Sequence, residues 1–258
     1  MQYLLRNKIG ALILGLCFSS AVNAQSDEVF QPNHDELPYY FGMSIGLSNN
    51  FLAFDRSTRF LPTRSSDPYS IIEINPIHNL YYNLGLVGTL RLTKHVLLRA
   101  NPTLLIVGTK NVIDFKVKQT PELSQKLNVS SSIIHLPLAL KFQSDRYNGF
   151  KHAGLMRHYL LVGGKFDFDL ASSKAGKITS PTGAVVSGSY PSVLKGTDMG
   201  AEIGLGLSFY LRYATISPEV KFSYGLKDLH KLSSTYPLMN NLEKVTSNFV
   251  YFTIHIEN

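Results

Sequence analysis

One segment near the C-terminal end constrains the fold more than any other. From residue 199 to 211 the odd positions are apolar, and from 214 to 226 the even positions are apolar. A β-strand points successive side chains to opposite faces, so each run predicts one strand with an apolar and a polar face. Each run is longer than the usual globular strand of about 5–6 residues and than the about 9–11 residues that span a bilayer. The two runs therefore predict a membrane-spanning hairpin with one face toward lipid.

The connection between the two runs predicts their register. A two-residue turn at 212–213 would pair Phe209 with Ile216 and Leu205 with Val220. This pairing keeps the apolar side chains of both strands on the same face of the sheet. The turn itself lacks the Gly or Asn that is typical of a two-residue hairpin.

The N-terminal segment predicts secretion. Arg6 and Lys8 precede an apolar run at 9–18, and Val22-Asn23-Ala24 has the small-x-small form of a cleavage site. The alternative is a single membrane helix, but the run is shorter than the about 20 residues that a helix needs to span. We therefore expect a signal peptide at residues 1–24.

The rest of the chain predicts a closed barrel. Cys17 is the only cysteine, so the mature chain has no disulfide, no thiolate nucleophile and no cysteine metal site. No later stretch reaches the about 18 uninterrupted apolar residues of a membrane helix. Only helices and closed barrels satisfy their backbone in lipid, so we expect an all-β fold, a transmembrane antiparallel β-barrel. The barrel domain would occupy residues 39–258, after a polar periplasmic N-terminal leader at 25–38 that we expect to be flexible.

Six further segments alternate in the same way: 39–48, 80–92, 96–106, 134–142, 160–170 and 250–256. With the hairpin they make eight strands, an even number that is typical of such barrels. The long connections predict loops at 49–76, 108–131, 171–196 and 227–246. They alternate with shorter connections, so we expect both termini in the periplasm and the protein in the cell outer membrane. The 143–157 connection is long for a periplasmic turn. Pro102 and Pro218 lie inside strands and predict local bulges. A soluble barrel of the lipocalin type, with its apolar face inside, is the alternative.

Ten charged residues share the polar face of these strands and would point into the barrel: Arg91, Arg99, Lys141, Lys165, Asp167, Asp169, Glu202, Glu219, Lys221 and Glu257. An eight-stranded barrel is only wide enough for side chains to fill, and charges removed from water need partners. We interpret the ten as a structural, salt-bridged network. The alternative is a catalytic pair, Asp167 with Asp169, but nothing in the sequence brings His135, His158 or His255 beside it. We expect no catalytic residues.

Binding motifs are scarce. His152 and His158 lie six residues apart, without the close spacing of a zinc site. The glycines at 200, 204 and 206 belong to a strand, where they relieve crowding or admit long side chains from neighbours, and not to a phosphate loop. The net positive charge is spread along the chain and predicts no nucleic-acid surface. We expect no metal, no cofactor and no small-molecule substrate.

Several segments resemble a known family. They are LLVGGKFDFDLAS (160–172), GTDMGAEIGLGLSFYLRYATISPEVKFSYGL (196–226), the ending NFVYFTIHIEN, IIHLPLALKFQSDR (133–146) and LTKHVLLRANPTL (92–104). The chain is similar here to the PorT family of Bacteroidetes, and the likeness covers roughly residues 39–258. The resemblance implies an outer-membrane barrel that the type IX secretion system needs for export of proteins with C-terminal sorting domains and, in some members, for gliding motility. It implies no catalytic residues.

The expected function is therefore non-enzymatic, with a structural or assembly role in a protein-export machine. Its partners would be outer-membrane lipid and other type IX secretion components. Two alternatives stay open: a general small barrel that acts as an adhesin or surface-stability protein, and a barrel enzyme of the protease or acyl transferase type.

Overall fold

The computed structural model describes residues 31–56, 71–76, 78–107, 111–117, 123–128, 132–146, 156–171, 176–179, 185–190, 194–231 and 242–258. The predicted signal peptide and the first part of the predicted leader, residues 25–30, lie outside these described residues. Within the described ranges, no helix is long and apolar enough to cross a membrane.

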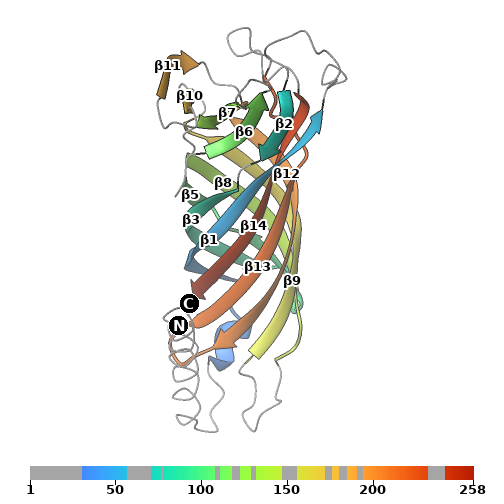
Figure 1. Ribbon diagram of the computed structural model, residues 1–258. Coiled ribbons are helices and arrows are strands. Elements are labelled where there is room, and N and C mark those ends of the chain that lie inside the picture. Colours follow the sequence, from blue (N-terminus) through green and yellow to red (C-terminus); the bar gives the residue numbers. More distant parts are fainter. Residues whose placement is uncertain are drawn as a thin grey trace, which may run out of the picture.

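Eight antiparallel strand positions close into a tall barrel with strongly tilted strands (Figure 1). Their order around the ring is β1, β14, β13, β12, β9, β8, β4 with β5, and β3, and the β1–β3 pairing closes it. The bounds are β1 (Tyr39–Arg56), β3 (Asn79–Arg91), β4 (Val96–Ala100), β5 (Thr103–Val107), β8 (Ser132–Gln143), β9 (Met156–Asp169), β12 (Thr197–Tyr210), β13 (Thr215–Gly225) and β14 (Leu242–Glu257). The eight predicted strands are confirmed, and β1 and β14 extend further than predicted.

The predicted hairpin register is confirmed. In the β12–β13 pair, Phe209 lies opposite Ile216 and Leu205 lies opposite Val220. The turn is closed by a hydrogen bond in which the Leu211 backbone N–H donates to the Ala214 carbonyl at 3.0 Å. The apolar faces of the two strands therefore agree, as side-chain alternation requires.

The bulges predicted at Pro102 and Pro218 are wrong. The chain is irregular at Asn101 and Pro102, but β4 and β5 pair with β3 in one continuous register, and with β8 in another. Pro218 stays in register opposite Ile254 of β14. Proline removes one ladder donor. Long neighbouring strands hold each of these strands on both sides. The missing hydrogen bond therefore does not lead to a bulge, in which one strand would contain an extra residue.

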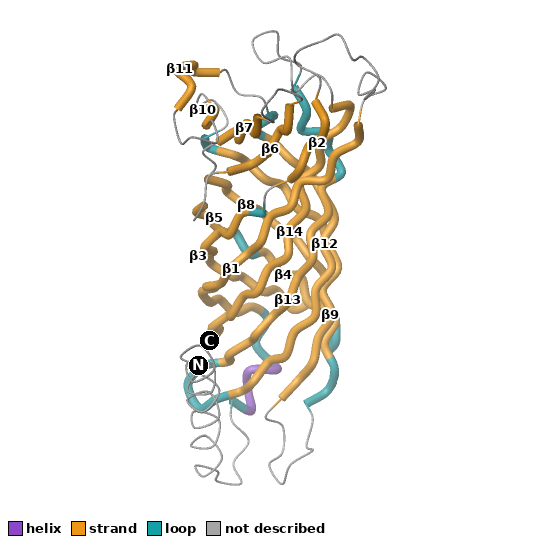
Figure 2. Tube along the Cα trace, viewed as in Figure 1, coloured by secondary structure: helices purple, strands orange, loops and turns teal. Residues whose placement is uncertain are grey.

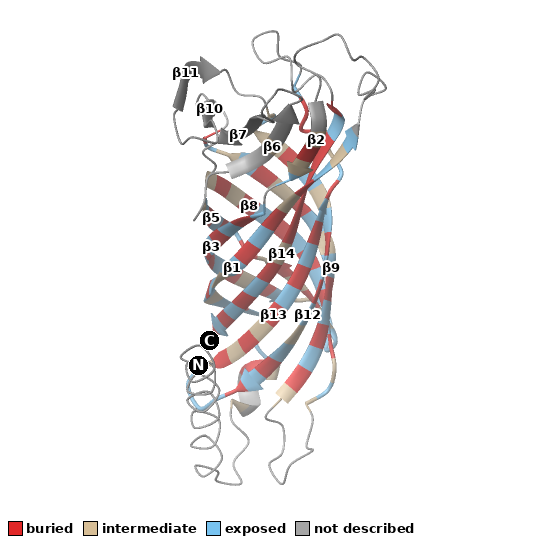
Figure 3. Ribbon diagram, in the orientation of Figure 1, coloured by how far each residue is buried: buried red, intermediate tan, exposed pale blue. Residues whose placement is uncertain are grey.

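Buried and exposed residues alternate along the barrel strands (Figure 3). Large apolar side chains point outward: Phe41 and Leu205 are each 65 % exposed. Polar side chains such as Ser217 and His255 are fully buried inside. A soluble lipocalin-type barrel would show the opposite arrangement, so the outer face is the lipid-facing one.

A second, smaller sheet lies beyond the end of the barrel opposite the C-terminus (Figure 1). It has five strands in the order β11 (Val185–Tyr190), β10 (Gly176–Thr179), β7 (Leu123–Asn128), β6 (Asn111–Val117) and β2 (Ile71–Pro76). These strands fall in segments that the sequence predicts to be loops, so that prediction is wrong for them. The strands are short, with four to seven residues each, and their pairing comes from the tertiary context more than from local pattern.

The glycines of β12 admit long side chains from neighbouring strands, as predicted. A Cβ on Gly206 would overlap the ring of Tyr159, and a Cβ on Gly200 would lie 2.6 Å from Cε of Lys165. The missing side chains therefore make room for a tyrosine and a lysine inside a narrow lumen.

A pair of adjacent glycines on β9 offers a matched test of this packing. A Cβ on Gly163 would overlap the backbone of Leu138 and Ala139, whereas a Cβ on Gly164 has its nearest contact at 3.5 Å. We expect Gly163→Ala to lower the free energy of unfolding by about 1–3 kcal/mol, the usual cost of overpacking. Gly164→Ala should leave it nearly unchanged. Urea titration of the protein inserted in lipid vesicles measures both, and equal effects of the two substitutions would contradict this account.

Candidate functional site

The structure places eight of the ten predicted interior charges on the inner face of the barrel, where each is at most 7 % exposed: Arg99, Lys141, Lys165, Asp167, Glu202, Glu219, Lys221 and Glu257. The other two lie at its ends. Arg91 donates from Nη2 to the His34 carbonyl at 3.1 Å. Asp169 accepts from the backbone N–H groups of Ser132 and Ala171. These two therefore differ from their predicted place, because each lies at the last residue of its strand.

Arg99 organises the half of the interior nearer the termini. Its guanidinium donates to Glu219 at 3.1 Å and to both carboxylate oxygens of Glu257 at 2.9 Å. The Tyr159 hydroxyl also donates to Glu219, at 3.0 Å, and Lys141 Nζ lies 4.2 Å from the centre of the Tyr159 ring. These contacts join β4, β8, β9, β13 and β14 across the lumen. Both Glu257 oxygens accept from the same nitrogen, Nη2. Hydrogen bonds between ionised groups are roughly twice as strong as those between neutral groups.

A second cluster fills the other half of the interior. This half lies nearer the five-stranded sheet beyond the end of the barrel, which we call the outer sheet. His135 lies between two carboxylates, with Nδ1 2.6 Å from Asp167 and Nε2 3.3 Å from Glu202. Lys221 pairs with Glu202 at 2.9 Å. The ring of Tyr251 stacks on His135 with centroids 5.0 Å apart.

Lys165 completes this second cluster, with Nζ 2.7 Å from Asp167 and 3.0 Å from Asp198. Five further inward side chains pack as one buried group: Tyr81, Leu105, Ile133, Phe249 and Tyr251. The cavity near this group measures about 70 Å³. Pockets for drug-sized ligands measure roughly 300–1,000 Å³, so this one is too small for such a solute.

Sequence reasoning missed several members of the network. Asp198 precedes the apolar run at Met199, so extending the alternation by one residue would have placed it inside. His255 has the same parity as Glu257, so alternation places it inside as well, but only the folded barrel shows that its Nε2 lies 3.3 Å from Glu219. Tyr159 likewise precedes the outward Leu160, and alternation would have found it. What no pattern shows is which of these residues meet across the lumen.

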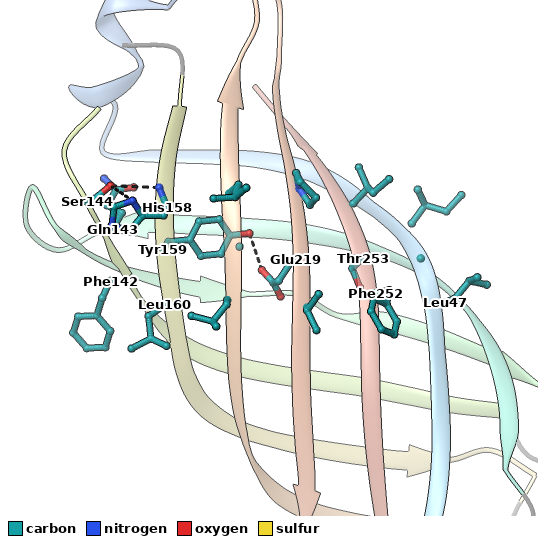
Figure 4. A pocket seen from close by; sticks show the side chains of 18 of the residues that line it. Leu47, Phe142, Gln143, Ser144, His158, Tyr159, Leu160, Glu219, Phe252 and Thr253 are labelled. Atoms are coloured by element: carbon teal, nitrogen blue, oxygen red, sulfur yellow. Dashed lines mark hydrogen bonds between the residues drawn. The ribbon is translucent and has the colours of Figure 1, made fainter. Parts of the chain in front are cut away.

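The alternative catalytic pair is not assembled as a unit. Asp167 contacts His135 and Lys165, whereas Asp169 binds backbone N–H groups at the rim. His158 lies elsewhere, with Nδ1 3.3 Å from the Ser144 hydroxyl (Figure 4). That hydroxyl donates to the Asp145 carbonyl at 2.9 Å. Across the part of the chain that the structure describes, no group of three or more His, Cys, Asp or Glu side chains is arranged so that it could hold a metal ion; His152 lies outside that part.

A shallow groove of about 1,030 Å³ runs along the outside of the barrel. Outward apolar side chains such as Leu47, Leu160 and Phe252 line it, while Tyr159 reaches inward to Glu219 (Figure 4). This surface faces lipid, so acyl chains fill the groove in the membrane.

The described part of the predicted leader is folded against the barrel. Residues Pro32–Asp35 form a short 3-10 helix, η2, at the end where the C-terminus lies (Figure 2). The ring of His34 lies 4.6 Å from that of Tyr40 and 5.5 Å from that of Tyr210. Thr215 donates to the side-chain carbonyl of Gln31 at 3.0 Å. The leader was predicted to be flexible, and this part of it is instead held by side chains from the strand ends.

Asp35 anchors the segment. Its Oδ2 accepts from Arg146 Nε at 2.9 Å and from Arg157 Nη2 at 2.6 Å. The Arg146 guanidinium also lies 4.0 Å from the centre of the Tyr210 ring. The residues that hold Gln31, His34 and Asp35 come from β1, β3, β9, β12, β13 and the chain just after β8. We call this end of the barrel the periplasmic mouth.

Arg99 should dominate the stability of the inner network. Arg99→Met leaves Glu219 and Glu257 buried without their cation, and we expect a loss of about 3–5 kcal/mol in the free energy of unfolding. Lys94→Met is the control, because Lys94 and Asp145 form a solvent-exposed ion pair and exposed pairs contribute little. Urea unfolding in vesicles is the measurement. A loss from Arg99→Met no larger than that from Lys94→Met would show that the network is not structural.

Residues 31–38 should be held less firmly against the barrel as the pH falls. We call the form in which they lie on the barrel the seated form, and the form in which they have left it the released form. Burial lowers the pKa of His34 below its ordinary value of 6.5. The carboxylates of Asp35 and Glu257 raise this pKa, whereas the positive charges of Arg146 and Lys141 lower it further. The seated form therefore prefers neutral His34 and loses stability as pH falls below about 6.5, where the released form takes up the proton. A spin label on Glu36→Cys should gain mobility between about pH 7 and pH 5. The same label in His34→Gln should show no such change; a pH-independent signal in both proteins would contradict the prediction.

A comparison with protein families agrees with this architecture. A family model described as "Outer membrane protein beta-barrel domain" matches residues 23–231. A search of curated protein sequences finds no significant match.

Solved structures that the chain resembles include Neisserial surface protein A, with 8 % identity, 85 % of this chain and 97 % of that chain covered, and a TM-score of 0.42. The attachment invasion locus protein Ail of Yersinia pestis, in complex with a heparin analogue, has 11 % identity, coverage of 86 % and 100 %, and a TM-score of 0.36. OprG of Pseudomonas aeruginosa has 14 % identity, coverage of 85 % and 94 %, and a TM-score of 0.36.

The family match spans most of the chain, and the folded structure is a closed barrel with an apolar outer face. The protein is therefore a member of the outer membrane protein β-barrel domain family and resides in the outer membrane.

Proposed function

We propose that this barrel is a non-enzymatic component of a type IX protein-export machine, with a structural or assembly role. One observation carries the proposal: the lumen is filled by two stacked charge clusters and an apolar group, so the barrel is not a conduit for cargo. A barrel with a closed interior acts through its two ends or its outer wall. The sequence resemblance to the PorT family supports the export role among the functions that are open to such a barrel.

The second candidate is a surface-binding barrel of the adhesin or surface-stability type. The five-stranded outer sheet favours it, because this sheet extends the protein beyond the barrel on the side away from the termini. Binding residues are often carried on loops and short elements that a rigid scaffold positions. The two candidates therefore place the contact at different parts of the same molecule.

Deletion of the gene separates them. If the barrel serves export, cargo proteins with C-terminal sorting domains should accumulate in the periplasm and stay unprocessed. Immunoblots of culture medium, periplasm and outer membrane measure this. If the barrel is only an adhesin, cargo secretion stays normal and binding of whole cells to surfaces falls. Normal secretion in the deletion strain would therefore end the export proposal.

Expression of variants in the deletion strain shows which end of the barrel is needed for secretion. A variant with residues 111–128 replaced by a short Gly-Ser turn removes the β6–β7 hairpin from the outer sheet and leaves the barrel strands intact. An assembly role at the periplasmic side predicts restored secretion by this variant, whereas a role of the outer sheet predicts failure. Heat-modifiable gel migration confirms that the barrel has folded in each case.

A further inference from the structure

The periplasmic mouth has the composition of a carboxylate-binding site. Two arginines, Arg146 and Arg157, donate to one carboxylate, and their guanidinium groups lie near the ring of Tyr210 at 4.0 Å and 5.7 Å. Arginine is suited to planar recognition of carboxylates and also stacks on aromatic rings. The arginine side chains are only 11 % and 5 % exposed, so the pair is held in place by the barrel.

Asp35 occupies this site incompletely. Both arginines donate to the same oxygen, Oδ2, while Oδ1 is buried and has no hydrogen-bond partner among the described residues. A carboxylate in the two-pronged arrangement would use both of its oxygens. Asp35 thus uses only one of its two carboxylate oxygens as an acceptor.

Donors around the site are also left over. Among the described residues, Nε of Arg157, Nε of Arg91 and the side-chain amide nitrogen of Gln31 are buried with no partner. Arg157 itself is only 4 % exposed. Buried donors without partners are uncommon in folded proteins and call for an explanation. Arg157 contacts the Asp35 carboxylate through Nη2, so its Nε is a donor at the site that this carboxylate does not satisfy.

The occupying segment is also short. Its regular structure is the four-residue helix η2, and Glu36, Leu37 and Pro38, which follow it, are exposed. Its described contacts with the barrel are a few hydrogen bonds, the ion pairs of Asp35 and the ring contacts of His34. A short segment held in this way belongs to the less stable part of a structure. No residue of 31–37 belongs to a described strand pair, so its release breaks no strand pairing of the barrel.

We propose that Arg146, Arg157 and Tyr210 form a carboxylate-binding site, the mouth site, which Asp35 occupies in the free protein and which an acidic segment of a periplasmic protein partner takes over. Residues 31–38 then act as a built-in competitor of that partner. The proposal does not depend on the export role, because any periplasmic partner with an exposed acidic segment satisfies it. Its failure would leave the secretion experiment unaffected.

The test uses the protein purified from outer membranes in detergent and a fluorescent peptide with the sequence of residues 31–38, QPNHDELP. Asp35→Asn removes the internal carboxylate and should bind the peptide at least about tenfold more tightly than the native protein does, since a charge-assisted hydrogen bond no longer has to be displaced. Glu36→Gln makes the same change of charge at the exposed neighbouring residue and should bind like the native protein. Fluorescence polarisation measures each affinity.

Two further arms show that the carboxylate and the arginines are recognised. A peptide with Asn in place of its Asp should bind the Asp35→Asn protein about tenfold more weakly, and adding Arg157→Gln to that protein should have a similar effect. Heat-modifiable migration checks that each variant is folded. The proposal is overturned if Asp35→Asn binds the peptide no better than the native protein, or if the Asn peptide binds as well as the Asp peptide.

Discussion

The width of an eight-stranded barrel is the constraint on which the rest of this structure depends. The lumen is too narrow for water to solvate a row of charges and too wide for the strands alone to fill it. Every interior charge therefore has to find a partner on another strand, as Arg99 does with Glu219 and Glu257. The same constraint explains Gly200 and Gly206 of β12, because the long side chains of Lys165 and Tyr159 on the neighbouring strand β9 extend over these positions.

Alternation along the sequence predicted much of this fold. It located the eight strands, the register of the β12–β13 hairpin and the two faces of each strand, because each of these follows from a local period of two. The choice of the apolar face as the lipid-facing one came from the strand lengths and the signal peptide, and not from the alternation. Alternation did not predict the outer sheet, whose strands β6, β7, β10, β11 and β2 have only four to seven residues each, too few for a clear period of two. It also overestimated the effect of proline, since Pro102 and Pro218 disturb hydrogen bonds without shifting the register.

The candidate sites show the same division. Lys165 and Glu202 point inward because they alternate with outward apolar residues in the sequence. Which residues they contact, Asp198 and His135, depends on the order of the strands around the ring. The mouth site was not foreseen at all. Asp35 belongs to a segment that looks like a polar leader, and its two arginine partners come from the 143–157 connection and the start of β9, more than a hundred residues away in the chain. Contacts of such separation have no signature in a single sequence.

The pairing of Arg99 with Glu257 has a consequence for how the barrel forms. The two residues are 158 positions apart in sequence and lie on β4 and β14. Glu257 belongs to the strand that closes the ring on β1, so this charge finds its partner only when the last strand arrives. Until then, an inserted sheet would expose unpaired carboxylates and guanidinium groups next to hydrocarbon, at a high cost in free energy. Folding and membrane insertion are thus coupled: the nascent sheet has to stay at the membrane surface, or in contact with an insertion factor, until the ring closes.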